Sequence, residues 1–333
     1  MAEINNPIRK NWSGISNQLS IFSTFIIIIL VVFLFSFFKS DNSNRQEKTG
    51  KYNEKYAVYA LDIPEELDFA GEKVPIENFD VRESFDRELL INTYWQSQTL
   101  LFIKKANRYF PLIEPILKKN GIPDDFKYLA LAESGLTHAI SPARAVGFWQ
   151  FIEGTAKEFG LEINEEVDER YNIVKSTQAA CRYLNKSYSL YENWTLVAAS
   201  YDGGRAGISR QISRQKEENY YDLLFGEETG RYVFRILAIK EIMSDPEKYG
   251  FYFREKDLYP VIPTYEVLID SSVTDFANFA KYFSINYKIL KLFNPWLRDK
   301  YLTNSENKQY IINIPEMKFR NINSLNDYSL TDE

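Results

Sequence analysis

The feature that most constrains the fold of this chain is an uninterrupted apolar run at residues 21–38, IFSTFIIIILVVFLFSFF. It contains no charge and no helix breaker, and about 18 apolar residues are enough to cross a bilayer as a helix. Phe37, Phe38 and Lys39 stand where a signal peptide would have a small-residue cleavage site, so we expect an uncleaved transmembrane anchor. Residues 1–20 would form a tail on one side of the membrane, and the rest of the chain must fold outside the bilayer.

The chain after this run divides into segments of different character. Residues 39–58 are polar and aperiodic, which is typical of a linker. Helical patterns dominate from about residue 85 to about residue 250. After Pro260 the order is strand, helix, helix, strand, with the strands expected at residues 265–270 and 309–315. We therefore expect a mainly α fold with an N-terminal extension at residues 59–108, a helical domain at 109–255, a small βααβ module at 260–316 and a tail at 317–333.

Composition excludes several kinds of chemistry. The chain has one histidine, His138, and one cysteine, Cys181, so it cannot assemble a zinc site from cysteine and histidine ligands. The net charge of −6 offers no basic stripe to a nucleic acid, and the chain contains no nucleotide-binding or calcium-binding motif. We expect catalysis to depend on carboxylates, amides and aromatic side chains, without a metal or cofactor. His138 is expected in a loop, and Cys181 is expected as an inert thiol in the core.

A carboxylic acid ends an apolar helix in the segment LALAESGL. Glu133 shares one helical face with Phe126 and Leu129, so it falls on the buried side of that helix. Burial disfavours the ionised form and raises the pKa, and a carboxyl that is protonated near neutrality can act as a general acid and afterwards as a base. Ser134 could hydrogen-bond the carboxyl or a ligand. The alternative is that Glu133 forms a structural ion pair with an arginine such as Arg144.

The segment SPARAVGFWQF, residues 141–151, offers the groups that a carbohydrate site uses. Gly147 permits a turn or the close approach of a ligand. Phe148 and Trp149 have flat apolar faces that suit the C–H faces of sugar rings, and Gln150 can both donate and accept hydrogen bonds. The alternative is that the aromatic residues belong to the core. Some of them must, because three aromatic side chains in four positions cannot all face one groove.

A second polar pair is expected at the end of another helix. In VAASYDGG, residues 197–204, an apolar helix ends in Tyr201 and Asp202, and two glycines follow. This arrangement would present two polar side chains beside flexible backbone. The alternative is an ordinary helix end in which Asp202 favours the turn.

Taken in order, these segments resemble the clan of soluble lytic transglycosylases and goose-type lysozymes, whose signature is Glu-Ser, then Gly-x-x-Gln, then Ala-Tyr-Asn. The corresponding residues here are Glu133-Ser134, Gly147-Phe148-Trp149-Gln150 and Ser200-Tyr201-Asp202. Longer blocks such as AVGFWQFIEGTAKEFGL and RYVFRILAIKEI are similar to lytic transglycosylases as well, and the resemblance covers about residues 60–250.

The resemblance implies a lysozyme-like helical domain that acts on peptidoglycan. Enzymes of this family break the β-1,4 bond between N-acetylmuramic acid and N-acetylglucosamine without water. Carried over, Glu133 protonates the bridging oxygen and then takes the proton of the muramyl C6 hydroxyl, which closes a 1,6-anhydro ring; the acetamide of the substrate assists, so a second carboxylate is not needed. The residues that the resemblance assigns to substrate binding or to support of the acid are Ser134, Gly147, Phe148, Trp149, Gln150, Tyr201 and Asp202.

The third motif departs from the family pattern, because Asp202 stands where the family has asparagine, and Ser200 replaces an alanine. An aspartate cannot donate a hydrogen bond unless it is protonated, and its charge would raise the pKa of a nearby Glu133 further. A hydrolytic muramidase and a non-catalytic peptidoglycan-binding protein therefore remain alternatives to a lytic transglycosylase.

The C-terminal segments FSINYKILKLFNPWL and YIINIP are similar to a LysM module, which binds chains of N-acetylglucosamine. The usual Gly-Asp-Thr/Ser-Leu after the first strand is replaced here by residues 271–274, Ser-Ser-Val-Thr. The module either binds glycan or only packs against the rest of the chain.

The resemblance also implies a location. Basic residues flank both ends of the run at residues 21–38, so the count of charges does not set its orientation. Murein lies outside the inner membrane. We therefore expect an inner-membrane anchor with residues 1–20 in the cytoplasm and the catalytic domain facing the periplasm and the cell wall.

Overall fold

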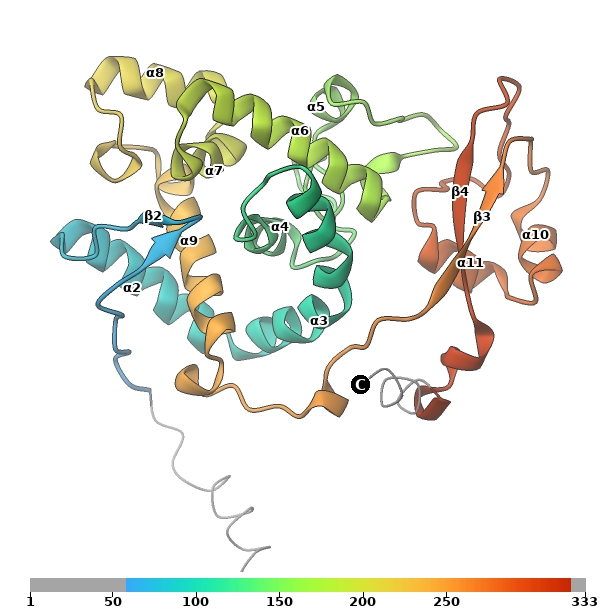
Figure 1. Cartoon of the computed structure of the whole chain (residues 1–333), viewed down its shortest axis with the longest axis horizontal. Coiled ribbons are helices and arrows are strands. Elements are labelled where there is room, and N and C mark those ends of the chain that lie inside the picture. Colours follow the sequence, from blue (N-terminus) through green and yellow to red (C-terminus); the bar gives the residue numbers. More distant parts are fainter. Residues whose placement is uncertain (1–57, 325–333) are drawn as a thin grey trace, which may run out of the picture. The chain divides into compact units, whose positions relative to one another are not determined.

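The computed structural model describes residues 58–324. A helical body is followed along the chain by a small strand–helix–helix–strand module, and both lie in one compact unit that begins at Leu61. In Figure 1 the helices of the body surround α4. The body contains β1 (Asp68–Phe69), β2 (Glu72–Lys73), α2 (Phe79–Tyr94), α3 (Gln96–Lys119), α4 (Phe126–Ser134), α5 (Glu153–Glu158), α6 (Ile173–Tyr191), α7 (Trp194–Gly203), α8 (Arg205–Gln215) and α9 (Glu227–Ser244).

Helix α4 is internal because its sequence is apolar on almost every side. Phe126, Leu129 and Leu131 are fully buried, and the helix packs against α3 and α9. It ends where Gly135 takes the left-handed conformation, with φ 58°, and donates its backbone N–H to the carbonyl of Leu131. A residue with a Cβ is strained in this conformation, so the glycine fixes the end of the helix directly after Glu133 and Ser134.

Helix α7 is anchored at its beginning by the N-terminal hairpin. The carboxylate of Glu72 in β2 accepts hydrogen bonds from the backbone N–H groups of Trp194 and Thr195, at 2.6 and 2.9 Å, and from Oγ1 of Thr195 at 2.7 Å. An acidic group satisfies the unpaired N–H groups at the start of a helix and interacts favourably with its dipole. The other end of α7 carries Tyr201 and Asp202.

The C-terminal module has the expected order of elements. Strands β3 (Thr264–Ile269) and β4 (Tyr310–Pro315) pair antiparallel, with Thr264 opposite Pro315 and Ile269 opposite Tyr310. Helices α10 (Phe276–Tyr282) and α11 (Tyr287–Phe293) lie between them in the sequence. Alternate residues of β4 are buried, as the strand period requires, and they form the core of the module with the two helices.

One part of the expected fold class is corrected. Among residues 58–324, no helix is both long enough and apolar enough to cross a membrane. The apolar run at residues 21–38 lies outside the described range, together with the expected tail before it and the expected linker up to residue 57. The described fold is a mainly helical body with a two-stranded module, and no membrane-spanning helix belongs to it.

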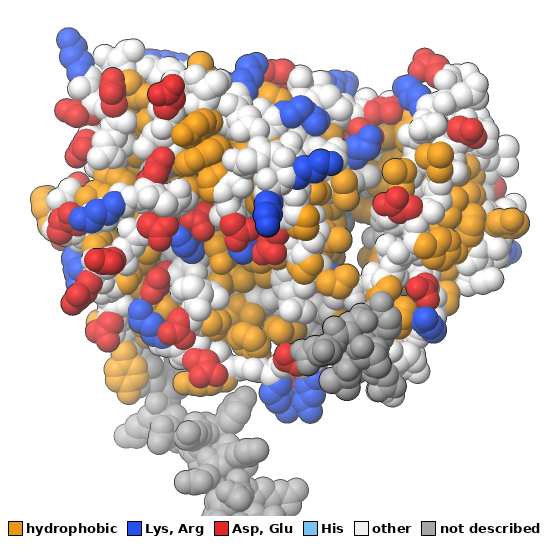
Figure 2. All heavy atoms as spheres, in the orientation of Figure 1, with side chains coloured by type: hydrophobic (Ala, Val, Ile, Leu, Met, Phe, Trp, Pro, Cys, Tyr) orange, Lys and Arg blue, Asp and Glu red, His pale blue; other side chains and the backbone are white. Residues whose placement is uncertain are grey.

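The surface mixes charged and apolar side chains. On the face shown in Figure 2, acidic and basic side chains of the described part are interspersed, and hydrophobic side chains are exposed between them. The module contributes Tyr282, which is 83% exposed, and Leu292, which is 61% exposed. Scattered exposed apolar residues are ordinary, so a functional site has to be located from buried polar groups instead.

Candidate active site

The carboxyl group of Glu133 projects from the end of α4 and is only partly exposed. Its Oε1 accepts a hydrogen bond from the hydroxyl of Tyr232, which comes from α9 and is 2% exposed. Glu133 therefore bonds a buried phenol rather than Arg144, the alternative considered from the sequence. Arg144 lies in the following loop, where its side chain is exposed and its carbonyl accepts a bond from Arg170.

The surroundings of Glu133 keep its carboxyl close to the point of protonation at neutral pH. Burial raises the pKa of Glu133 to about 7, the bond from Tyr232 opposes that rise, and the negative charge of Asp202 adds to it. Two other charges on α9 have smaller effects, with Arg235 lowering the pKa of Glu133 and Glu228 raising it. A carboxyl in this state can give up a proton and later take one back.

Asp202 reaches the same helix from the end of α7. Its Oδ2 accepts a hydrogen bond of 2.6 Å from Oγ1 of Thr229. Burial raises the pKa of Asp202, and the bond from Thr229 opposes the rise. Thr229 and Tyr232 are three positions apart on α9 and so lie on one face of that helix. One face of α9 thus donates hydrogen bonds to both carboxyl groups, from the phenol of Tyr232 to Glu133 and from the hydroxyl of Thr229 to Asp202.

The loop at residues 139–151, called the site loop below, is attached to both helix ends. Oγ of Ser134 donates to the carbonyl of Phe148 at 3.0 Å, and the hydroxyl of Tyr201 donates to the carbonyl of Trp149 at 2.7 Å. The side chain of Gln150 bonds back to the loop itself, because Nε2 donates to the carbonyls of Ala139 at 3.1 Å and Gly147 at 2.8 Å. In this structure, Ser134, Tyr201 and Gln150 therefore hold the site loop in place.

Gly147 is required by a close backbone approach. Its φ is 82°, and a Cβ at this position would lie 2.1 Å from the carbonyl oxygen of Arg170. No heavier residue fits without moving one of the two backbones. The glycine of the second motif therefore has a structural reason that is independent of any ligand.

The two aromatic residues of the second motif lie in the core. Phe148 is 1% exposed and Trp149 is 0% exposed. Nε1 of Trp149 donates to Oγ1 of Thr177 at 2.9 Å, which satisfies the only polar atom of the indole ring. In this structure both rings pack inside the body and leave no face free for a sugar ring.

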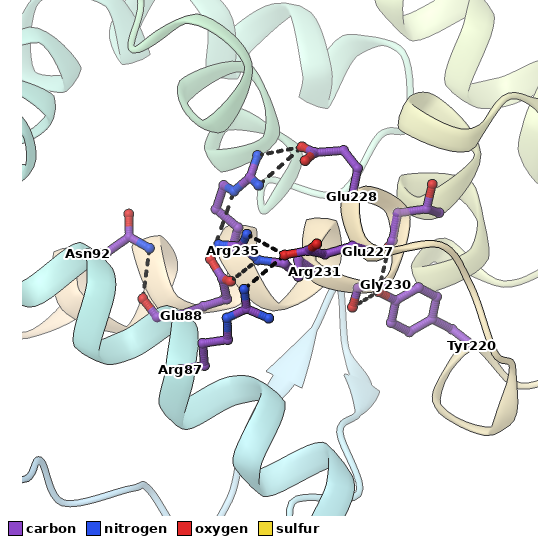
Figure 3. A network of polar contacts seen from close by, with 10 residues as sticks. Arg87, Glu88, Asn92, Tyr220, Glu227, Glu228, Gly230, Arg231 and Arg235 are labelled. Atoms are coloured by element: carbon purple, nitrogen blue, oxygen red, sulfur yellow. Dashed lines mark hydrogen bonds and ion pairs between the residues drawn. The ribbon is translucent and has the colours of Figure 1, made fainter.

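A network of charged residues involves the same stretch of α9 and is drawn in Figure 3. Glu88 of α2 is 1% exposed, and its carboxylate lies 2.7 Å from Nε of Arg231 and 3.9 Å from Nε of Arg235. Arg235 also contacts Glu228, with both Nη atoms 3.1 Å from Oε1. The buried carboxylate thereby fixes two arginines on the helix that carries Tyr232.

The single histidine and the single cysteine stay outside this constellation. His138 lies in the loop after α4, between the rings of Phe148 and Tyr171, and burial lowers its pKa to about 4. Cys181 is fully buried, and burial raises its pKa to about 12, so the thiol stays neutral. The expectation of a core thiol is confirmed. Within the described residues, no cluster of three or more histidine, cysteine, aspartate or glutamate side chains is arranged to hold a metal ion.

The sequence does not single out Tyr232 and Thr229, the two residues of α9 that bond the carboxyl groups. Both are far from their partners along the chain. Tyr232 lies within the part of the chain where helical patterns are expected, and a tyrosine on the buried face of a helix is a signal in itself, because its hydroxyl needs a partner.

Two family models match the chain. Residues 111–224 match the family described as "Transglycosylase SLT domain", and residues 265–318 match "Soluble lytic transglycosylase C-terminal LysM-like domain". The resemblance to lytic transglycosylases and to a LysM-like module is thereby confirmed for these two segments. Glu133, Gln150 and Asp202 lie within the first segment, whereas α9 with Tyr232 lies beyond it.

Curated relatives agree with the family models. The chain is 27% identical over 253 residues to "Membrane-bound lytic murein transglycosylase D" of Escherichia coli strain K12, which covers 73% of this chain and 54% of the relative. The chain thus spans about half the length of the curated relative that it matches. Among solved structures, an inactive mutant of the lytic transglycosylase Slt of Pseudomonas aeruginosa has a TM-score of 0.34, at 18% identity over 44% of this chain and 26% of that chain. A likeness of this size carries no weight for fold or activity.

Proposed function

We propose that this chain, which carries an SLT transglycosylase domain and a LysM-like module, is a peptidoglycan lytic transglycosylase that acts on the cell wall. The observation that carries the proposal is the state of Glu133. This carboxyl stands at the end of a helix inside the matched domain, bonded to Tyr232, and its pKa is raised to about 7. Such a group can serve as the acid and then as the base of one reaction.

In the proposed reaction Glu133 gives one proton to the glycosidic oxygen of the substrate and later receives one proton from the muramyl C6 hydroxyl. Because Tyr232 donates to Oε1, the proton of the neutral carboxyl is carried by Oε2. Glu133 gives this proton to the oxygen that bridges N-acetylmuramic acid and N-acetylglucosamine, and the bond from C1 to that oxygen breaks. The muramyl C6 oxygen then bonds to C1 and its proton passes to Glu133, which closes the 1,6-anhydro ring and restores the acid.

The other motif residues are proposed in two roles. Asp202 stands beside the acid on the same face of α9, where it tunes Glu133 and can accept hydrogen bonds from sugar hydroxyls. Ser134, Gln150 and Tyr201 act on the substrate through the site loop that they hold. We assign catalysis to the domain at residues 109–255, and residues 260–316 to a LysM-like module.

A hydrolytic muramidase is the second candidate, and Asp202 is the observation that favours it. Two-carboxylate glycosidases pair an acid with a base or nucleophile. Asp202 supplies a second carboxylate that acts on the pKa of Glu133. In that case the cleaved muramyl residue would carry an ordinary reducing end, with water bonded at C1.

Digestion of purified murein sacculi by the full chain tests the proposal, with mass spectrometry of the released muropeptides. We expect products that end in 1,6-anhydro-N-acetylmuramic acid, and we expect Glu133→Gln to abolish their release. The matched control is Glu153→Gln, because Glu153 is exposed on α5 and forms an ion pair with Lys157 of the same helix. Reducing ends instead of anhydro ends would establish the muramidase. Binding to sacculi without any product, also in Asp202→Asn, would establish a non-catalytic protein.

A further inference from the structure

The C-terminal module forms main-chain hydrogen bonds with the helical body. Val167 and Leu297 pair as an antiparallel bridge, and the backbone N–H of Asp168 donates to the carbonyl of Trp296 at 2.9 Å. The backbone N–H of Arg298 donates to the carbonyl of Glu166 at 2.7 Å. The segment at residues 166–168 therefore pairs with the connection between α11 and β4 through an isolated bridge and two backbone hydrogen bonds. Paired backbone groups fix the register of two segments more firmly than side-chain contacts alone.

The site loop shares an apolar cluster with the module. Val146, next to Gly147 in the site loop, is 4% exposed. It belongs to the same buried cluster as Val167 and Tyr171 of the body and as Phe276, Trp296 and Leu297 of the module. The module thus covers an apolar side chain of the loop that carries the second motif.

Arg170 joins this contact to the middle and to the C-terminal end of the site loop. Arg170 is 9% exposed, and its guanidinium bonds the carboxylate of Asp168 with two atoms, Nε at 2.9 Å and Nη2 at 2.7 Å. Nη1 donates to the carbonyls of Arg144 at 3.2 Å and Phe151 at 3.3 Å. A planar guanidinium fixes several acceptors at once, which a lysine cannot do. The backbone carbonyl of Arg170 also packs against Gly147, at the place where a Cβ would otherwise stand.

A continuous series of contacts therefore leads from the module to the groups around Glu133. The carbonyl of Trp296 holds Asp168, and the carboxylate of Asp168 holds Arg170. Arg170 holds the site loop, whose carbonyls accept bonds from Ser134 and Tyr201. Ser134 follows the acid directly in the chain, and the charge of Glu133 contributes to the raised pKa of Tyr201.

We propose that the C-terminal module holds the site loop in its catalytic arrangement, and that Arg170 is the positioning residue through which it does so. The inference rests on the proposed function for the meaning of that arrangement. A site loop that is held in place limits the access of water to the muramyl C1. The muramyl C6 hydroxyl then attacks C1 before water does. A loosened loop admits water, which lowers the rate and diverts part of the product to reducing ends.

Two variants of the full chain test the inference from opposite sides of the contact. Arg170→Lys keeps the charge beside Asp168 and loses the fork that bonds the site loop. The double variant Arg298→Ala/Tyr310→Phe changes the module alone. It removes the guanidinium 4.1 Å above the ring of Tyr171 and the hydroxyl that bonds Glu162 at 3.1 Å. The control is Lys281→Ala, which is exposed on α10.

Turnover is measured as kcat, KM and the anhydro fraction of the products, for proteins whose circular dichroism matches that of the wild type. For Arg170→Lys we expect a fall in kcat of about 10- to 100-fold, little change in KM, and a lower anhydro fraction. The double variant should change kcat and the anhydro fraction in the same direction, and Lys281→Ala should change neither. Unchanged kcat and anhydro fraction in Arg170→Lys, or in the double variant, would overturn the inference.

Hydrogen–deuterium exchange separates this inference from the proposed function, because it needs no substrate. We expect the backbone amides of residues 144–151 to exchange faster in both variants than in the wild type or in Lys281→Ala. Unchanged exchange would reject the role of the module, whatever the activity. Faster exchange in a protein whose wild type releases no product would retain the mechanical coupling and reject the proposed function.

Discussion

The hydroxyl of Tyr232 donates its hydrogen bond to Oε1 of Glu133, although 99 positions separate the two residues in the sequence. The bond favours the ionised carboxylate, while burial and the charge of Asp202 favour the neutral acid. The pKa of Glu133, raised to about 7, is the balance of these opposing effects. The balance can be shifted in either direction by single substitutions, because each effect comes from a different side chain.

Under the proposed function, removing the phenol should shift the pH dependence of turnover to higher pH. Tyr232→Phe deletes the hydrogen bond that lowers the pKa of Glu133, so the acid stays protonated above pH 7. We expect the basic limb of the profile of kcat/KM against pH to move upward, and kcat to fall about tenfold because the carboxyl is less well oriented. The profile is measured on soluble glycan strands. A limb that moves downward would contradict this assignment.

Removing the negative charge beside the acid should have the opposite effect. Asp202→Asn deletes a charge that raises the pKa of Glu133, while the amide oxygen can still accept the bond from Thr229. We therefore expect the basic limb to move to lower pH, in the same assay. Glu153→Gln, an exposed change on α5, serves as the control and should leave the limb where it is. Equal shifts in the control would mean that Asp202 acts only through net charge.

The side chain of Glu133 should lower the free energy of unfolding at alkaline pH. The pKa of Glu133 is raised from 4.5 to about 7 in the folded state, so folding binds a proton between these values. The favourable contribution is fully present below pH 4.5 and is lost as the pH rises through 7. Glu133→Gln lacks this loss, and we expect it to be more stable than the wild type at pH 8 by up to about 3 kcal/mol. Urea unfolding should show that the difference shrinks towards pH 4.5.

Gly147 and Gly154 give a matched test of the close contact between the backbones of Gly147 and Arg170. In Gly147→Ala the new Cβ would lie 2.1 Å from the carbonyl oxygen of Arg170 at a φ of 82°. We expect a loss of about 2 to 4 kcal/mol in the free energy of unfolding. Gly154 lies in α5 with nothing within 4 Å of an added Cβ, so Gly154→Ala should be neutral or stabilising by up to about 1 kcal/mol. Thermal unfolding of both variants decides the point.

The buried carboxylate of Glu88 should matter more than the exposed ion pairs near it. Glu88→Ala leaves the guanidinium groups of Arg231 and Arg235 without their buried partner, and we expect a loss of about 2 to 4 kcal/mol. Arg87→Ala breaks a pair with Glu227 in which both side chains are at least half exposed, and it should cost less than about 1 kcal/mol. Equal losses in denaturant unfolding would show that the network is not organised around Glu88.

The local parts of the site could be predicted from the sequence because helical periodicity is local. The spacing of Phe126, Leu129 and Glu133 predicts an acid on the buried side of a helix, at its end, and the helix is found with a left-handed glycine after it. The strands of the module were expected at residues 265–270 and 309–315 and lie within one residue of these positions.

The parts that depend on tertiary packing could not be predicted. A loop has no period, so nothing in the spacing of Phe148 and Trp149 distinguishes a buried ring from one that faces a groove. The partner of Glu133 comes from a helix 99 positions away, and the pairing of Val167 with Leu297 joins segments that are still further apart. Such contacts are fixed by how the elements pack, which periodicity in one sequence does not reveal.

The carboxylate of Glu72 satisfies the first N–H groups of the helix that ends in Tyr201 and Asp202. The family match at residues 111–224 leaves this glutamate out at one end and α9 out at the other. A recombinant fragment trimmed to the matched range would therefore lack the carboxylate that bonds the backbone N–H groups of Trp194 and Thr195 at the start of α7. It would also lack Tyr232, the hydrogen-bond donor to Glu133. Anyone who expresses a shortened version for crystallisation or screening should start it upstream of the N-terminal hairpin and stop it well past Tyr232.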